Sequence, residues 1–576
     1  MKTQTDLREQ LRSIDHKSYP LYKSLQGSYQ FPKYTLSIDH VQGDPFAAPS
    51  QVRVTVDRKE AGFPEFTCKD DLTRTALADE LLRTFGEEIR KYTYKAKGSG
   101  KSGQISVTSC GQEVLKRTAC EVGEREIVAR FSVGFPANGR TIHARELEKI
   151  LFEYLPACVE HAFYYRNLKP EKIKNVIELA KDQQAVRDWL KEHGYVAFVA
   201  DGAILPRESG ISQRPMKQAV RFTSPDSMRV ELSLPHKGKI TGMGIREGIT
   251  LIVGGGYHGK STLLNALELG VYNHIAGDGR EYVITDETAV KLRAEDGRFI
   301  KDTDISLFIN DLPNGKDTKH FSTEDASGST SQAAGIVESM EAGSRLILLD
   351  EDTSATNFMV RDAFMQQVVS PEKEPITPFV SRAVELYEKA GMSTILVAGS
   401  SGAFFHIADT VIQMDCYVPV DITEKAKQLC GQFPVSKEQP KTFRFPESSR
   451  RMEKEKNGGT RRRDYRSGEV RKDEPEQWKL KTLGVDGFLL GKQHVDLRYV
   501  EQLIDSEQTA YLGMLLKYAV EHLSDGKRTI SDTAEFLWKK MDEDGMGFVA
   551  DRGRISGGYA LPRKQEIYAC LNRYRA

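Results

Sequence analysis

The pattern of apolar and polar residues changes character along the chain. Residues 31–41 are rich in aromatic and aliphatic side chains, a Gly/Pro-rich turn follows, and valines then alternate with polar residues over Val52–Val56. Such alternation is typical of a half-buried strand. Residues 70–92 carry leucines and other apolar residues at helical spacing, which predicts an amphipathic helix. We therefore predict a mixed α/β domain over residues 1–210.

A second pattern begins near Arg221. Short apolar runs alternate with helical segments as far as about Met414, as expected of helices packed on a sheet, and we assign residues 211–430 to one α/β domain. Residues 431–475 break the pattern and are interpreted as a basic linker or arm. Helical periodicity returns between Val500 and Val520, so we predict a small, largely helical C-terminal domain over residues 476–576.

The composition narrows the class of protein. With 576 residues, 39% hydrophobic and 28% charged, the chain has the size of about four folding units and is not broadly disordered. Its formal net charge of zero excludes a uniformly basic surface, although not a local basic patch. The sequence contains neither a continuous apolar run of membrane-spanning length nor a secretory signal at its polar start. Seven scattered cysteines without a CxxC pair indicate reduced thiols, so we expect a cytoplasmic protein without membrane contact.

The strongest motif is a glycine-rich loop between a predicted strand and a predicted helix. It fits G-x-x-x-x-G-K-[ST] and consists of Gly254, Gly255, Gly256, Tyr257, His258, Gly259, Lys260, Ser261 and Thr262. Glycines let backbone N–H groups converge on phosphate oxygens, and the lysine offers a charge to the β and γ phosphates. The hydroxyl of Ser261 is a candidate ligand of Mg²⁺. The apolar run before the loop and the leucine-rich run after it supply the order strand, loop, helix that this motif needs.

A second element places two carboxylates at the end of a buried strand. Four apolar residues at positions 346–349 lead to Asp350 and Glu351, ninety residues beyond Lys260. We expect Asp350 to hold Mg²⁺ and Glu351 to orient and deprotonate the attacking water. Neighbouring strand residues point to opposite faces, which favours different roles for the two acids.

Two further segments give the chain a family resemblance. Residues 350–357 (DEDTSATN) resemble the DEPTSALD run of ABC-type ATPases, and residues 326–332 (ASGSTSQ) resemble their LSGGQ signature. Ser327, Gly328 and Ser329 lie at the start of an expected helix, and Ser327 precedes Asp350 by 23 residues, the usual spacing of that signature. A Ser/Gly turn at a helix start offers N–H groups and a hydroxyl to a γ-phosphate without steric bulk.

The sequence is similar to the predicted ATPases of the ABC class, which are distinct from the transporters. The resemblance covers most of residues 20–425 and rests on these segments: HVQGDPFAAPS, FVADGAILPR, GGGYHGKSTLL, AGDGRE, LRAEDGR, FSTEDASGSTSQAA, LDEDTSATNFM and KEPITPF. It implies an α/β fold, an ABC-type P-loop ATPase core with an appended mixed α/β N-terminal domain and a small, largely helical C-terminal domain. It also implies ATP and Mg²⁺ as cofactors, and a homodimer that encloses nucleotide between Lys260 of one chain and Ser327 of the other.

The sequence departs from the transporter pattern at three places. The strand ending at Val397 is followed by Ala-Gly-Ser-Ser where a switch histidine is usual, and His406, the nearest histidine, is more typical of a structural residue. Asp352 replaces a proline and Asn357 an aspartate. These differences favour slow turnover and leave the group that senses the γ-phosphate open. Arg293 and its neighbours up to Arg298 either contact nucleotide or the facing chain, or form structural ion pairs.

Two basic segments make RNA or another nucleic acid a candidate partner, and the family resemblance implies the same partner. Residues 441–472 hold 12 basic and 5 acidic side chains with Tyr465 among them, and residues 91–103 form a lysine-rich glycine loop. The GKS triplet in this second loop lacks the motif's first glycine and a preceding strand, so we do not assign it to nucleotide. Two other functions stay open: a slow or non-hydrolysing ATP-gated scaffold for protein partners, and a phosphotransferase.

Overall fold

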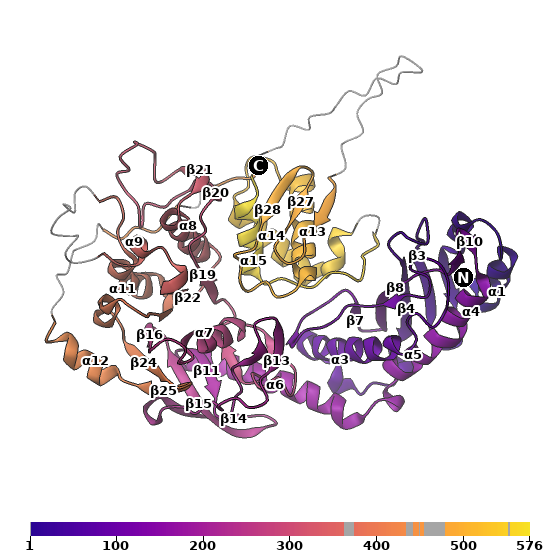
Figure 1. Cartoon of the computed structure of the whole chain (residues 1–576), viewed down its shortest axis with the longest axis horizontal. Coiled ribbons are helices and arrows are strands. Elements are labelled where there is room, and N and C mark those ends of the chain that lie inside the picture. Colours follow the sequence, from indigo (N-terminus) through magenta and orange to yellow (C-terminus); the bar gives the residue numbers. More distant parts are fainter. Residues whose placement is uncertain are drawn as a thin grey trace, which may run out of the picture.

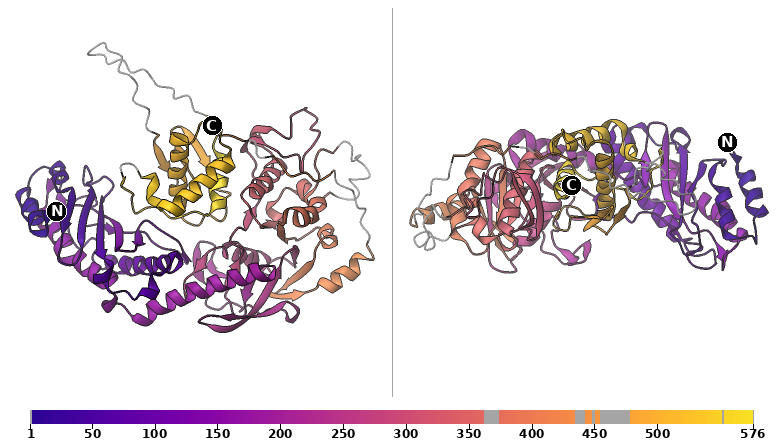
Figure 2. Two further views of the ribbon diagram at one scale, coloured as in Figure 1. Left: turned by 180° about the vertical axis from the view of Figure 1, so that it is seen from behind. Right: turned by 90° about the horizontal axis from the view of Figure 1, so that it is seen from above.

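The computed structural model describes residues 2–361, 374–433, 442–447, 450–453, 478–550 and 553–575. Its three parts form an arc, with the N-terminal part at one end and the C-terminal part seated on the concave side (Figures 1 and 2). The fold class predicted from the sequence is confirmed. Within these ranges, every helix is too short or too polar to cross a membrane.

The N-terminal part is a sheet covered by helices. Its strand order is β1-β2-β3-β4-β8-β5, with β7 paired to β8. In β4 the valines are buried and the residues between them are partly exposed, as the alternating pattern predicts. The strands are β1 (Lys2–Thr3), β2 (Gly27–Gln30), β3 (Thr35–His40), β4 (Ser50–Asp57), β5 (Ile105–Ser106), β7 (Cys120–Val122) and β8 (Glu126–Val133).

The helix expected over residues 70–92 is α3 (Asp71–Arg90), and it begins where local chemistry dictates. The Asp70 side chain caps it by accepting a hydrogen bond from the Thr73 amide, and the Thr73 hydroxyl accepts one from the Asp70 amide. The two bonds form a capping box. Its buried face packs against α5 (Leu155–Phe163) and α6. The other helices here are α1 (Gln4–Ser13), α2 (Arg58–Ala61) and α4 (Ala144–Lys149).

The long helix α6 (Pro170–His193) joins the N-terminal part to the central part (Figure 2). It ends at Gly194, which takes the left-handed conformation that favours glycine, and leads into β11 (Tyr195–Ala200). β11 pairs with strands on both sides in a four-stranded sheet of order β14-β15-β11-β18. Its other strands are β14 (Arg229–Leu234), β15 (Gly238–Arg246) and β18 (Val283–Thr285). A second link is the pairing of β6 (Glu113–Val114) with β17 (Asn273–His274).

The central part is built on a six-stranded sheet of order β19-β22-β23-β16-β24-β25, in which only the last pair is antiparallel. The interior strands are apolar because helices cover both faces of a parallel sheet. The strands are β16 (Ile249–Val253), β19 (Val290–Leu292), β22 (Leu346–Asp350), β23 (Ser393–Val397), β24 (Thr410–Asp415) and β25 (Val418–Asp421). The helices are α7 (Lys260–Leu269), α8 (Gly328–Glu341), α9 (Thr356–Met359), α11 (Phe379–Ala390) and α12 (Thr423–Cys430). A hairpin of β20 (Arg298–Thr303) and β21 (Phe321–Ala326) precedes α8.

The C-terminal part combines helices with a small antiparallel sheet of order β26-β27-β28. The prediction of helix from Val500 is wrong at its start: Asp505 caps α13, and residues 499–505 form turns and irregular backbone. The sheet was not predicted, since its strands are only three or four residues long. Its elements are β26 (Leu480–Thr482), β27 (Gly487–Leu490), β28 (Gln493–Asp496), α13 (Ser506–His522), α14 (Ile530–Asp544) and α15 (Lys564–Arg573).

Candidate nucleotide site

The glycine-rich loop lies between β16 and α7, as the motif requires. Gly259 caps α7 with φ of 97°, and Gly254 has φ of 143°, so both use backbone conformations that suit glycine. Tyr257 at the loop tip is fully exposed and also left-handed, at φ of 64°. Lys260 Nζ donates to the carbonyl oxygens of Gly254 at 2.7 Å and Gly255 at 3.0 Å, which holds the ammonium across the loop. The positive end of α7 and this ammonium make the loop an anion site.

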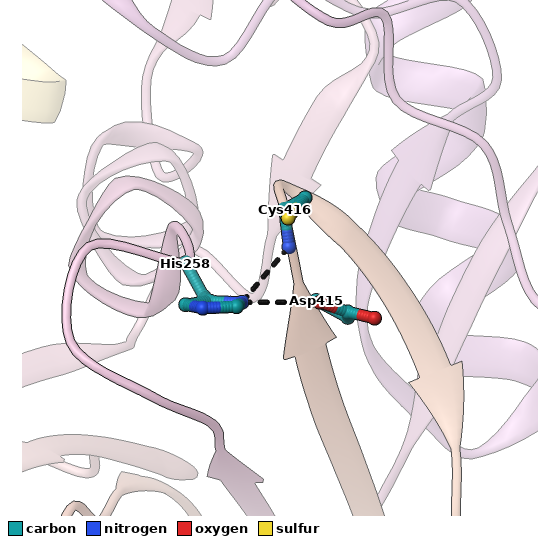
Figure 3. A group of neighbouring side chains, drawn as sticks. All are labelled: His258, Asp415 and Cys416. Atoms are coloured by element: carbon teal, nitrogen blue, oxygen red, sulfur yellow. Dashed lines mark hydrogen bonds and ion pairs between the residues drawn. The ribbon is translucent and has the colours of Figure 1, made fainter.

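The turn between β24 and β25 braces the loop from one side (Figure 3). The Cys416 amide donates to His258 Nδ1 at 3.0 Å, and the Tyr417 amide donates to the His258 carbonyl at 2.9 Å. Asp415 Oδ1 lies 3.2 Å from the same Nδ1. A Cβ on Gly259 would meet the Tyr417 ring at 2.7 Å, so this position has no room for a side chain.

His258, Asp415 and Cys416 lie close enough together to be considered as ligands of a metal ion. Ligand atoms of His258, Asp415 and Cys416 lie within 4.8 Å of one another. The hydrogen bond from the Cys416 amide occupies the lone pair of Nδ1, so this ring nitrogen is already used within the protein. We therefore interpret the group as the support of the phosphate loop. The sequence showed His258 as a loop residue but gave no sign of this support.

Asp350 lies at the carboxyl end of β22, level with the start of the phosphate loop. Asp350 and Ile252 are both in register with Val397 of β23, the strand that separates β22 from β16. Two strand spacings put their backbones about 10 Å apart, a span that phosphates and a metal ion can bridge. Burial raises the pKa of Asp350, against the hydrogen bond from the Asp352 amide and the charge of Lys291, which lower it.

Glu351 is held by the loop that follows β23. Its carboxylate accepts from the Gly399 amide at 2.7 Å, the Ser400 amide at 2.9 Å and the Ser400 hydroxyl at 2.7 Å. Partial burial works to raise the pKa of Glu351, but these hydrogen bonds outweigh it and hold the pKa below its usual value. Gly399 and Ser400 thus occupy the place after the strand where ABC transporters usually have a switch histidine. His406 lies exposed in a separate short helix, Gly402–His406.

The signature residues form a second site at the start of α8. Ser327 caps this helix, and its exposed hydroxyl lies 3.0 Å from the Thr330 hydroxyl, while Gly328 and Ser329 are buried. A hollow of about 490 Å³ opens here, and Arg293, Asp296 and Asp352 line it together with residues 327–329. The 14-residue helix directs its positive end at this hollow. A Cβ on Gly328 would meet Ala294, Asp296 and Ala355 at 3.1–3.4 Å, so glycine suits the crowded turn.

Hydrogen bonds fix the walls of this hollow, which we call the signature pocket. Gln332 donates to the Ser354 hydroxyl at 2.9 Å and accepts from the Ala355 amide at 3.0 Å. The Ala294 amide donates to the Thr353 carbonyl at 3.0 Å. The signature and the run after Glu351, recognised separately in the sequence, are therefore one structural unit.

The predicted site residues fall into two groups. Residues 254–262 with Asp350 and Glu351 gather at the carboxyl edge of the sheet, and residues 327–329 gather at the signature pocket. Among the described residues, the lining of the signature pocket includes no member of the phosphate loop. Figure 1 likewise shows α7 and α8 at different ends of the central part.

The two basic segments have different outcomes. Residues 91–103 form a turn-rich loop in which Tyr94, Lys95 and Lys97 are exposed, and Lys95 lies 4.7 Å from the Tyr92 ring centre. Ser102 is buried and bonds within this loop, which fits its exclusion as a nucleotide site. The segment 441–472 lies outside the described residues except for 442–447 and 450–453. Arg450 is buried against the carbonyls of Asn572 and Tyr574 and is thus engaged within the protein.

Three family models match consecutive stretches of the chain. Residues 4–166 match the model described as ATPase of the ABC class N-terminal, and residues 169–451 match the P-loop domain of the ABC_ATPase model. The chain belongs to the ABC-class P-loop ATPases. Residues 479–576 match the model of the MRB1590 C-terminal domain. The resemblance inferred from the sequence is confirmed, and with it an ATP-binding core.

One curated relative and one solved structure illustrate how far this family likeness reaches. The uncharacterized protein MJ1628 of Methanocaldococcus jannaschii is 33% identical over 241 residues, which cover 40% of this chain and 51% of that protein. The chain thus spans about half the length of this relative. The ADP conformation of MJ1267, an ATP-binding cassette of an ABC transporter, aligns over 34% of this chain and 88% of that one. Its identity is 13% and its TM-score 0.23, which is too low to support a structural comparison.

Proposed function

We propose that the chain is a Mg²⁺-dependent ATPase that works as a homodimer. Nucleotide bound by Lys260 and the loop amides of one subunit would be covered by Ser327, Gly328 and Ser329 of the other. The observation that carries this proposal is the separation of the phosphate loop from the signature pocket: among the described residues, the lining of the pocket includes no residue of the loop. A two-fold dimer brings each half of one subunit to the other half of its partner.

The residues at the sheet edge fit a magnesium ion. Ser261 is exposed at the first turn of α7, and Asp350 ends β22 at the same edge of the sheet. A hydroxyl and a carboxylate oxygen are therefore available as ligands of the ion. Mg²⁺ would neutralise charge on the phosphates there. Glu351 is ionised at neutral pH, as a glutamate of ordinary or lowered pKa is, and so it can accept a hydrogen bond from water and orient it.

The hydrogen bonds on Glu351 also support the alternative function. A carboxylate stabilised by Gly399 and Ser400 is a weaker base, so turnover would be slow. In the limiting case the protein would be a non-hydrolysing, ATP-gated scaffold for protein partners.

RNA is the partner that we propose for the hydrolysing protein. The exposed Tyr94, Lys95 and Lys97 combine an aromatic face with positive charge, as single-stranded nucleic acid requires. The double charge reversal Lys95→Glu, Lys97→Glu should weaken binding of a labelled single-stranded RNA at least about tenfold. Lys539→Glu, which reverses one exposed lysine on α14, is the control for a charge reversal elsewhere on the surface and should have little effect.

The experiment that tests the function measures phosphate release by the wild type and Glu351→Gln, each with and without single- and double-stranded RNA. We expect slow turnover by the wild type, a loss of at least about 100-fold in the variant with ATP binding retained, and a change of rate with RNA. Equal inactivity of both proteins would favour the scaffold. A wild-type rate that does not change with RNA would support the ATPase activity and contradict RNA as the partner.

A further inference from the structure

The signature pocket has an unusual charge for a site that would receive phosphate. Asp296 and Asp352 both line it and both are exposed, while Arg293 is the one cationic side chain among its lining residues. Two carboxylates repel a polyphosphate over such short distances. The helix terminus at Gly328 offsets only part of this charge. Arg293 is therefore the group that decides whether the pocket attracts or repels a phosphate.

Arg293 is at present engaged by the C-terminal part. Its Nη1 donates to Glu501 Oε1 at 3.0 Å, and its guanidinium carbon lies 4.6 Å from the ring centre of Tyr499. Its Nε is buried and has no hydrogen-bond partner within the described part of the chain. Its side chain is nevertheless 28% exposed. The guanidinium is thus held at the pocket wall by one ion pair and one ring, with hydrogen-bonding capacity to spare.

Glu501 has a second cationic partner, so it can release the first. Its other oxygen, Oε2, lies 2.8 Å from Lys291 Nζ, and the Lys291 side chain is only 5% exposed. If Arg293 turns into the pocket, Glu501 keeps the buried ion pair with Lys291 and no carboxylate is left without a partner. Breaking a buried charge pair would otherwise be strongly unfavourable.

We propose that Arg293 binds the terminal phosphate of the nucleotide carried by the facing subunit, and that Glu501 competes with this phosphate for the guanidinium. This rests on the composite site proposed above and assigns it a specific phosphate-binding residue with a built-in competitor. Arginine suits the role because its planar fork can pair with a carboxylate or a phosphate in the same way.

When nucleotide binds, the exchange would also change the contacts of the C-terminal part. The residue next to Glu501, Gln502, donates to the Glu268 carbonyl of α7 at 2.9 Å and accepts from the Lys291 amide at 3.0 Å. Its carbonyl accepts from the Tyr272 hydroxyl at 2.8 Å. The segment that releases Arg293 therefore touches the carboxyl end of α7, the helix whose first residue is Lys260.

The test measures ATP-driven dimer formation by sedimentation in a Glu351→Gln background, where bound ATP persists. Arg293→Ala should raise the ATP concentration for half-maximal association at least about tenfold, while nucleotide affinity of the monomer changes less than about twofold. Arg293→Lys should restore association in part. Glu501→Gln, which keeps the shape and removes the competing charge, should lower the required ATP concentration. The double variant should behave like Arg293→Ala, because the competitor acts only through Arg293.

Controls separate this inference from folding and from the proposed function. Arg498→Ala removes a neighbouring exposed arginine near the same Tyr499 ring, outside the pocket, and should associate like the parent. If Arg293→Ala lowers thermal stability, the conclusion is drawn from Arg293→Lys and Glu501→Gln instead. Normal association of these Arg293 variants beside an associating parent would overturn the role of Arg293 alone. A parent that does not associate with ATP would overturn the composite site, and this inference with it.

Discussion

The phosphate-loop half and the signature half of the site are built by opposite means. The loop is braced by hydrogen bonds within one domain, including those that the Cys416 and Tyr417 amides donate to the ring and the carbonyl oxygen of His258. The signature pocket is an open hollow whose cation is shared with another part of the chain through Glu501. The phosphate loop is thus held in shape by its own domain, whereas the charge available in the signature pocket depends on the C-terminal part through Glu501.

The largest effect is expected at the phosphate-loop half. Lys260→Ala removes the ammonium that would bind two phosphates, and each charge-assisted hydrogen bond contributes about 1.5–3 kcal/mol. ATP affinity should fall by at least about 100-fold, and hydrolysis should be lost. Titration of a fluorescent ATP analogue measures this directly. An unchanged affinity would show that the loop does not hold the phosphates.

The next effect is expected at the signature half and should leave binding intact. Ser327→Asp keeps a good helix cap but adds a third carboxylate to the pocket, which at an effective dielectric of about 20 costs roughly 4 kcal/mol against a phosphate at 4 Å. Phosphate release should fall by at least about 100-fold, because salt screens part of this energy, while monomer affinity for ATP is unchanged. Ser327→Asn, an equally good but neutral cap, is the control. Loss of ATP affinity in Ser327→Asp alone would mean that the two halves lie in one site within one chain.

The smallest effect is expected from the hydrogen bond by which the Ser400 hydroxyl lowers the basicity of Glu351. Ser400→Ala removes one of three hydrogen bonds to the carboxylate, so the pKa of Glu351 should rise toward its ordinary value and Glu351 should become a stronger base. We expect phosphate release to increase by about two- to fivefold. Steady-state rates at saturating ATP measure it. A decrease instead would assign Ser400 to the nucleotide itself.

How much of the structure the sequence predicts depends on how far apart in the chain two interacting residues lie. Lys260, Asp350, Glu351 and Ser327 lie in contiguous motifs, and the strand, loop and helix around them follow from local pattern. The partners of these motifs do not. Ser400 meets Glu351 from 49 residues away, and Cys416 meets His258 from 158 residues away. Such pairs follow from the order of strands in the sheet, which no periodicity in a single sequence encodes.

The C-terminal part shows the same limit. Apolar residues from Val500 fit a helix, yet Asp505 starts α13 only at Ser506, because its side chain accepts from the Glu507 amide. The residues before this cap instead form the turn that brings Tyr499 and Glu501 to Arg293, 208 residues earlier in the chain. The sequence left open whether Arg293 served an ion pair or a nucleotide. The structure shows an ion pair with Glu501, and we propose that nucleotide replaces it.

The most direct test of the composite site mixes two inactive variants. Lys260→Ala and Ser327→Asp each damage both sites of their own homodimer, but a mixed dimer holds one site with an intact Lys260 and an intact Ser327. Random exchange of subunits should therefore restore phosphate release to about a quarter of the wild-type rate, from half of the dimers with one of two sites each. A mixture no more active than the two variants measured separately would contradict a site shared between subunits.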